Sequence, residues 1–189
     1  MIPKIIHYCW FGENEKPKLA KKCIDSWKRY CPDYEIIEWN ESNFDLEQYP
    51  YLRWCHDHKK WAFLSDFARL LIIQENGGIY FDTDVELVRR PDEFLKYDAF
   101  YGFEDKEHVA TGLGFGAIAD ESTVKSMIDI YNNMQIDSNG EMKMIGCPRI
   151  NTDALLKYGL QLNGEMQTLG KVLILPDDYL NPYDDPTGR

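Results

Sequence analysis

The stretch from Trp61 to Leu87 constrains the fold more than any other part of this chain. It opens on apolar side chains at spacings of three and four residues, Phe63, Phe67, Leu70 and Leu71. That period, in an otherwise apolar segment, predicts a buried helix. The pair Gly77-Gly78 predicts its end, because glycine takes the left-handed cap conformation without steric cost. A strand is expected at Gly78 to Phe81, running directly into Asp82-Thr83-Asp84. Ligands of open α/β sheets bind beyond the carboxyl ends of strands, so this point is the predicted site.

Two charged residues, Asp66 and Arg69, interrupt the apolar helix and share one of its faces. Charges in so apolar a setting need a partner or a ligand. One interpretation is a buried ion pair that fixes the helix, and the other is a polar site for substrate. The glycine turn and the paired aspartates that follow favour the second.

Asp82 and Asp84 are separated by a single residue. Two such carboxylates can share a hard divalent cation and leave coordination positions open for phosphate oxygens. If the strand continues through them, with Val85 to Val88 as its extension, both aspartates point to the same side and Thr83 points away. The alternative is a solvated acidic turn, which a lone D-x-D usually is in an acidic protein.

Taken together, S-D-F-A-R, N-G-G-I-Y-F-D-T-D and the opening I-P-K-I-I-H-Y-C-W-F-G resemble the DXD-containing glycosyltransferases of family 32. That group includes bacterial capsule and surface-polysaccharide transferases and the yeast initiating mannosyltransferase, and the glucosylating clostridial toxins share its core pattern. The resemblance runs from Ile2 to about Pro182. It implies the GT-A fold, an α/β sandwich in which helices flank a mainly parallel sheet.

The resemblance also implies roles for particular residues. Mn²⁺ or Mg²⁺ would be held by Asp84, with Asp82 touching the ribose or a metal-bound water. Asp66 and Arg69 would hold sugar hydroxyls and a diphosphate oxygen, since a guanidinium suits bidentate contact with oxyanions. The remaining donor-binding candidates are Cys9, Trp10, Ser65, Tyr80, Thr111 and Gly112. Trp10 would stack on the nucleotide base, whereas the residues alone favour a tryptophan that covers the sheet end.

Other elements are expected along the chain from periodicity and turn residues. The predicted helices are Pro17 to Tyr30, Tyr51 to His58, Asp120 to Met134 and Thr152 to Tyr158, and the predicted strands are Ile2 to Trp10, Tyr34 to Trp39, Ala99 to Phe103, Gly112 to Ala119 and Val172 to Leu175. The run T-G-L-G-F-G-A carries glycines that let a backbone approach a ligand closely, but its spacing does not fit a dinucleotide fingerprint. The loop Ser138 to Pro148 is expected to border an acceptor site.

The composition narrows the class of protein to which this chain can belong. A 189-residue chain with 44% hydrophobic residues predicts one domain, 1–189, with a substantial core. A net charge of −11 speaks against a nucleic-acid surface. No apolar run is long enough to span a membrane. Five scattered cysteines predict reduced thiols in a cytoplasmic protein, with peripheral attachment to the inner face of the membrane requiring a basic patch or a partner. The sequence does not set the oligomeric state.

The function expected from these observations is metal-dependent transfer of a hexose from a nucleotide sugar, UDP-sugar being favoured, to a glycan or polysaccharide acceptor with retention. The first alternative is a phosphatase or phosphotransferase of the haloacid dehalogenase class, whose pattern wants Thr or Val where this chain has Glu86. The second is a non-catalytic sugar-nucleotide or glycan-binding module. In the resembled family a histidine-bearing segment follows the acidic tail Asp177 to Arg189, so the resemblance predicts that this chain lacks a C-terminal segment.

Overall fold

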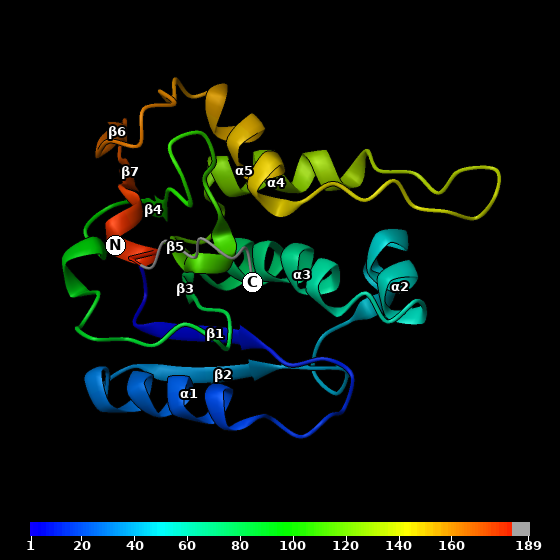
Figure 1. Ribbon diagram of the computed structural model, residues 1–189, viewed down its shortest axis with the longest axis horizontal. Coiled ribbons are helices and arrows are strands. Elements are labelled where there is room, and N and C mark those ends of the chain that lie inside the picture. The colour runs from blue at the N-terminus through cyan, green and yellow to red at the C-terminus, as the bar shows by residue number, and fades with distance from the viewer. Residues whose placement is uncertain (183–189) are drawn as a thin grey trace.

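The computed structural model describes residues 1–182 of the chain, and a sheet of seven strands forms the centre of that part (Figure 1). The strands are β1 (Ile5–Cys9), β2 (Glu35–Trp39), β3 (Gly78–Tyr80), β4 (Ala99–Gly102), β5 (Phe115–Ala117), β6 (Gln167–Leu169) and β7 (Val172–Leu175). The helices are α1 (Lys18–Tyr30), α2 (Pro50–Asp57), α3 (Trp61–Asn76), α4 (Ser122–Asn132), α5 (Cys147–Leu156) and α6 (Asp177–Leu180). The predicted α/β class is confirmed.

The strand order is β2-β1-β3-β5-β4-β7-β6, and the sheet is mixed rather than mainly parallel. β1 pairs in parallel with β2 and β3, whereas β5 runs antiparallel to both of its neighbours, β3 and β4. For β4 and β5 the reason is connection length: no α-helix separates them, and a parallel pair needs a crossover long enough to return the chain to the same edge. β1, β2 and β3 therefore end at one edge of the sheet.

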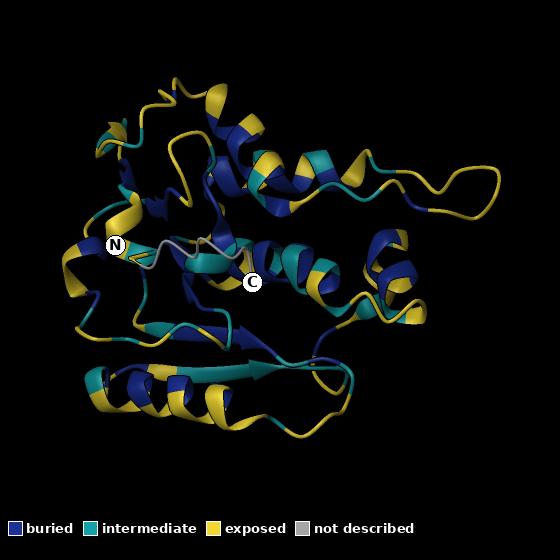
Figure 2. Ribbon diagram, in the orientation of Figure 1, coloured by how far each residue is buried: buried dark blue, intermediate teal, exposed yellow. Residues whose placement is uncertain are grey.

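Helices cover both faces of this sheet, and each face has its own apolar core (Figures 1 and 2). α1 packs on one face through Trp27 and Ile24, which meet Ile6 and Phe81. α2, α3, α4 and α5 pack on the other face, around Phe67. α3 pairs most closely with α4 and α2, so this central helix is enclosed along most of its length. That enclosure is what buries its charged residues.

The turn between α3 and β3 is held by glycine geometry and by a buried histidine. Gly77 ends the helix with φ of 63°, and its N–H donates to the carbonyl of Ile73. Gly78 has φ of 108°, and a Cβ there would lie 2.8 Å from the Ile5 carbonyl oxygen. The His7 ring is fully buried, with Nε2 2.9 Å from the Gly77 carbonyl oxygen and Nδ1 3.0 Å from the Trp39 indole N–H. Since Trp39 donates to Nδ1, Nε2 carries the proton and donates to Gly77.

The predicted continuation of β3 through the D-T-D motif is wrong. The strand ends at Tyr80, and the Val85 N–H donates to the Asp82 carbonyl over 3.0 Å, which closes a turn. A backbone that bonds to itself in this way has no free groups for a neighbouring strand. Val85 to Val88 accordingly forms no strand. The predicted site thus lies on a turn at the strand end rather than on the strand itself.

Three further boundaries differ from expectation. The predicted strand from Gly112 begins only at Phe115, because residues Thr111–Leu113 form a 3₁₀ turn and Gly114 has φ of 115°. α4 is capped by the carboxylate of Glu121, which accepts from two backbone N–H groups, and not by Asp120, whose φ is 58°. α5 begins at Cys147, five residues earlier than predicted, with proline in its first turn.

Across the described residues, no helix combines the length and apolarity needed to cross a bilayer. All five cysteines are free and buried, as the sequence predicted. The part of the predicted acidic tail beyond Pro182 lies outside the described residues.

Candidate active site

A cavity of about 710 Å³ opens at the carboxyl end of β3. Asp66 and Arg69 reach its wall from α3, Asp82 and Asp84 from the turn after β3, and Gly112 from the 3₁₀ turn before β5. These residues come from distant parts of the sequence. The glycine turn that directs β3 back alongside β1 is what brings the α3 pair and the D-T-D turn to one place.

Arg69 is the centre of the polar contacts in this cavity, and only 2% of it is exposed. Its Nη2 lies 2.7 Å from Asp66 Oδ1 and 3.3 Å from Asp82 Oδ1. Its Nε donates to the carbonyl oxygen of Ser65 over 3.1 Å. The guanidinium lies 5.0 Å above the ring of Tyr80, whose hydroxyl donates to Asp82 Oδ1 over 3.0 Å. The structure confirms the buried ion pair between Asp66 and Arg69 and places it on the wall of the cavity, while contact of this pair with a substrate stays a prediction.

The charges of this cluster do not balance. Burial raises the pKa of both Asp66 and Asp82, against the opposing effect of Arg69. Burial on its own would lower the Arg69 pKa, but the Asp82 carboxylate and its neighbours raise that pKa well above its ordinary value. A single guanidinium thus faces two carboxylates, with Asp84 close enough to add to the shift at Asp82. The cavity has an excess of negative charge, which favours a cation.

The second terminal nitrogen of Arg69, Nη1, indicates that a ligand binds in this cavity. Nη1 is buried and has no hydrogen-bond partner among residues 1–182. An unpaired donor on a buried charged group is costly, typically about 1–3 kcal/mol or more. A Cβ placed at Gly112 would lie 3.0 Å from this atom and 3.0 Å from Asp82 Oδ2. Glycine therefore keeps open the space that a ligand oxygen would need to reach Nη1.

The donor set suits a hard divalent cation that is shared with a ligand. Asp82 uses Oδ1 for Arg69 and Tyr80, and within residues 1–182 its Oδ2 accepts no side-chain hydrogen bond. Asp84 is exposed on the wall of the same cavity. No group of three or more His, Cys, Asp or Glu side chains in the described part of the chain is arranged to hold a metal ion alone. Two carboxylates fit a cation whose remaining ligands are phosphate oxygens and water.

Residues 17–101 match the family model described as "Glycosyltransferase sugar-binding region containing DXD motif". The matched range includes α3, the glycine turn and the D-T-D turn. This part of the chain is similar to the sugar-binding region of the DXD glycosyltransferases. This finding confirms the resemblance that the sequence motifs indicated, and residues 17–101 are called the DXD region below.

Curated relatives are similar to part of this chain. A mannosyl phosphorylinositol ceramide synthase of Saccharomyces cerevisiae is 35% identical over 108 residues, which is 53% of this chain and 27% of that protein. An uncharacterized glycosyltransferase of Acanthamoeba polyphaga mimivirus is 27% identical over 148 residues, 74% of this chain and 58% of that protein. The chain thus spans little more than half the length of the viral relative and about a quarter of the yeast one.

Solved structures show the same fold. The glycosyltransferase named PaToxG superposes with a TM-score of 0.61 at 21% identity, over 82% of this chain and 69% of that one. A glycosyltransferase involved in glycosylation of the major capsid of PBCV-1 superposes with a TM-score of 0.50 at 14% identity, over 93% of this chain and 83% of that one. The architecture is that of the GT-A glycosyltransferases.

The other predicted donor-binding residues lie around the DXD region at different distances from the cavity. Trp10 lines a separate hollow of about 320 Å³ beside Glu38 and Asn40, at the edge where β1 and β2 end. The ammonium group of Lys16 lies 5.5 Å over its ring. Cys9 is buried behind the site, where burial raises its thiol pKa to about 12. The structure therefore separates Trp10 from the cluster around Arg69.

Three further predicted donor-binding residues lie behind the cavity wall: Tyr80, Ser65 and Thr111. Tyr80 is 1% exposed and supports Asp82 and Arg69 from below. Ser65 contributes its carbonyl oxygen to Arg69. Thr111 is fully buried, and its backbone N–H donates to the side chain of Asn151. Their predicted contacts with a donor remain predictions.

Sequence reasoning missed two kinds of residue. Cys147 lines the cavity at the start of α5, close enough to Asp66 to affect the pKa of that carboxyl. The expectation that the loop up to Pro148 borders the site gave a partial signal for it. Ser26 and Trp27 of α1 contact the segment after Asp84. In the sequence Trp27 was visible only as part of an apolar stripe, which carries no information about a hydrogen bond.

Proposed function

We propose that this chain acts as a metal-dependent glycosyltransferase that moves a hexose from a nucleotide sugar to a glycan or polysaccharide acceptor. The observation that carries this proposal is the unpartnered, buried Nη1 of Arg69, a residue that lines the same cavity as Asp82 and Asp84. A cation beside a free guanidinium donor suits a diphosphate, whose oxygens can bind both. The match of the DXD region supports the assignment.

Each residue of the cavity has a proposed role. Asp84 and Oδ2 of Asp82 would hold Mn²⁺ or Mg²⁺, and when bound the cation would offset charge that builds on the departing diphosphate. Nη1 of Arg69 would donate to a phosphate oxygen. Asp66 would accept from a sugar hydroxyl while it orients Arg69 through its 2.7 Å contact. Tyr80 would keep Asp82 Oδ1 engaged, so that Oδ2 faces the cation.

The nucleotide base would bind at the hollow beside Trp10. β1 and β3 are parallel neighbours, so this hollow and the larger cavity lie along the same edge of the sheet. A donor whose diphosphate contacts the D-T-D turn can then extend its base toward β1. UDP remains the favoured nucleotide, and the name of the yeast relative suggests mannose as a hexose to test.

We propose retention of the anomeric configuration, by front-face displacement. Asp66 and Asp82 are both engaged by Arg69, which weakens either one as a covalent nucleophile. The acceptor would be a surface or capsular polysaccharide made on the cytoplasmic side of a bacterial membrane, with attachment to that membrane through a partner. An inverted product would contradict the stereochemical part.

The test is incubation of the purified chain with a panel of UDP- and GDP-hexoses and Mn²⁺, with release of free sugar and nucleotide measured in the absence of an acceptor. We expect slow hydrolysis of one donor class that stops on chelation of the metal. Hydrolysis of a generic aryl phosphate, with none of the sugar donors, would instead support the phosphatase alternative. Donor binding without any turnover would support the binding-module alternative.

A further inference from the structure

The segment that carries Asp84 has no regular secondary structure of its own. We call residues 82–91 the DXD loop. Within residues 1–182 no hydrogen-bond donor contacts the Asp84 carboxylate, and the residue is exposed. The position of this carboxylate therefore depends on how the backbone around it is held.

Helix α1 holds that backbone directly after Asp84. The indole Nε1 of Trp27 donates to the Val85 carbonyl over 2.8 Å. The Leu87 N–H donates to Ser26 Oγ over 2.9 Å. The Val85 N–H in turn closes the turn onto Asp82, so one residue joins the two aspartates to the helix. Ser26 and Trp27, which are neighbours on α1, thus hold the backbone of the loop at Leu87 and Val85.

Both anchors are themselves immobilised. Trp27 is fully buried, with its ring 5.5 Å from Tyr8 and 5.6 Å from Phe81 between ring centroids. Ser26 is 1% exposed and donates its hydroxyl to the Cys23 carbonyl over 2.5 Å, which leaves a lone pair for Leu87. A side chain already fixed by packing loses little further entropy when it binds the loop. These are rigid supports rather than adaptable contacts.

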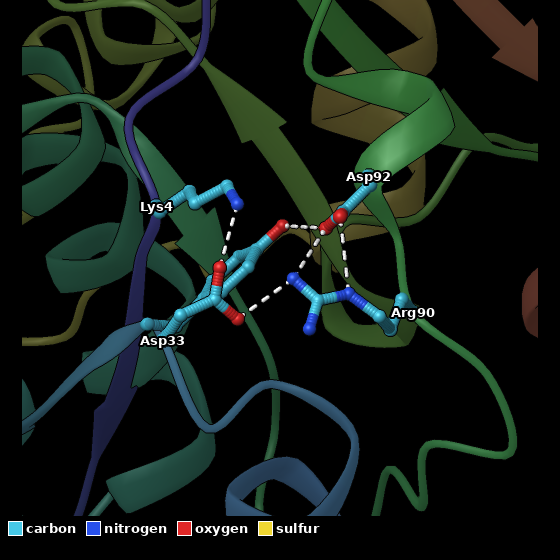
Figure 3. Close-up of polar contacts among 5 residues, drawn as sticks. Lys4, Asp33, Arg90 and Asp92 are labelled. Atoms are coloured by element: carbon cyan, nitrogen blue, oxygen red, sulfur yellow. Dashed lines mark hydrogen bonds and ion pairs between the residues drawn. The ribbon is translucent and has the colours of Figure 1, made fainter.

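The far end of the DXD loop is tied to the same βαβ unit (Figure 3). Arg90 lies between Asp33, at 2.7 Å, and Asp92, at 3.0 Å, and Lys4 pairs with Asp33 at 2.6 Å. The hydroxyl of Tyr34 donates to Asp92 over 2.6 Å. Single exposed ion pairs contribute little to stability, but this network also contains the partly buried hydrogen bond from Tyr34 to Asp92. The loop is therefore held at both ends.

We propose that Trp27 and Ser26 are positioning residues of the cation site, which act through the backbone of Val85 and Leu87 to hold Asp84 in place. This inference rests on the proposed function. Residues that orient metal ligands without touching the metal commonly change metal affinity about 10- to 100-fold when they are replaced. Here the support comes from the opposite face of the sheet from α3, so the cation and the sugar contacts have separate scaffolds.

The test uses Ser26→Ala, which removes one hydroxyl, and Trp27→Phe, which removes the indole donor but keeps an aromatic ring. Mn²⁺ is titrated in the presence of a fixed concentration of UDP, with binding followed by calorimetry. We expect the dissociation constant for Mn²⁺ to rise about tenfold in each variant. In a turnover assay the Mn²⁺ requirement should rise by the same factor, while the rate at saturating Mn²⁺ stays close to wild type.

Tyr101→Phe is the matched control, because it also removes one buried hydroxyl hydrogen bond, to Thr123, but packs on the α3 side of the sheet. It should leave Mn²⁺ affinity unchanged. Hydrogen exchange at the Leu87 amide gives a readout that needs no metal, and it should accelerate in Ser26→Ala. If Ser26→Ala and Trp27→Phe fold and bind Mn²⁺ with wild-type affinity, this inference is overturned while the proposed function stands. Absence of Mn²⁺-dependent UDP binding in the wild-type protein would overturn the proposed function and, with it, this inference.

Discussion

Arg69 shows how one buried residue can be structural and functional at once. Nη2 and Nε bond within the protein, to Asp66 and to Ser65, which fixes the plane of the guanidinium. Nη1 has no partner within residues 1–182 and lies beside Gly112, on the wall of the cavity. Nη1 is therefore a preorganised donor for a ligand oxygen. The entropy cost of orienting the guanidinium has already been met by the fold before the ligand binds.

Gly112 gives a prediction at the same scale. Gly112→Ala should fold, since its φ does not lie in the left-handed region, but its methyl group would lie 3.0 Å from Arg69 Nη1 and Asp82 Oδ2. We expect affinity for UDP-sugar to fall about tenfold or more, from the loss of one charge-assisted hydrogen bond. Calorimetric titration of the donor measures this, with Gly146→Ala as control, where an added Cβ meets only Pro148 at 3.8 Å. Equal affinities in the two variants would contradict the placement of the ligand at Nη1.

At the scale of elements, the long periodic helix and the glycine turn were predictable. Both the apolar period of the helix and the glycines that end it can be recognised in a short stretch of neighbouring residues. The path after Asp82 was not. Alternation of side chains indicated a continuing strand, whereas the Val85 N–H turns back to Asp82, and nothing local marks that hydrogen bond. Glu121 replaced Asp120 as the cap of α4 for a similar reason: both side chains can cap, and the left-handed φ of Asp120 decides. β6 (Gln167–Leu169) escaped prediction because it is short and polar.

The turn between α3 and β3 leads to a prediction about pH. Burial lowers the pKa of His7 from 6.5 to about 4, partly offset by its bond to Gly77. Above pH 6.5 the ring is neutral in both folded and unfolded chains, and its contribution to stability is complete. As the pH falls from 6.5 to about 4, only the unfolded chain takes up the proton, so stability is lost in that window. The loss attributable to this residue is about 3 kcal/mol at most.

The measurement is the free energy of unfolding by denaturant at several pH values between 4 and 7, for wild type and His7→Gln. Contributions of other titrating groups are common to both proteins and cancel in the difference. We expect the wild-type curve to fall more steeply than that of the variant below pH 6.5. Parallel curves would show that His7 does not carry the pH dependence of this turn.

At the scale of the whole molecule, the site draws on both faces of the sheet. α3 supplies Asp66 and Arg69 from one face, and α1 supports the D-T-D turn from the other. The sequence singled out Asp66, Arg69, Asp82 and Asp84 as candidates because these residues break an apolar pattern. It could not show that Arg69 links Asp66 to Asp82, or that Trp10 lies in a separate hollow, because these relations depend on strand order and on the mixed sheet.

The central claim, a nucleotide-sugar site that depends on a divalent cation, is tested most directly by thermal stability. The melting temperature of the purified chain is measured with UDP- and GDP-sugars, each with and without Mn²⁺, for wild type, Asp84→Ala and Asp57→Ala. Asp57 is an exposed carboxylate at the end of α2, ion-paired with Arg53, and serves as the control. A ligand that binds only the folded state raises the melting temperature by mass action. We predict a Mn²⁺-dependent rise with one nucleotide class in wild type and Asp57→Ala that is absent in Asp84→Ala. A rise that Asp84→Ala retains in full, or one that needs no metal, would contradict the claim.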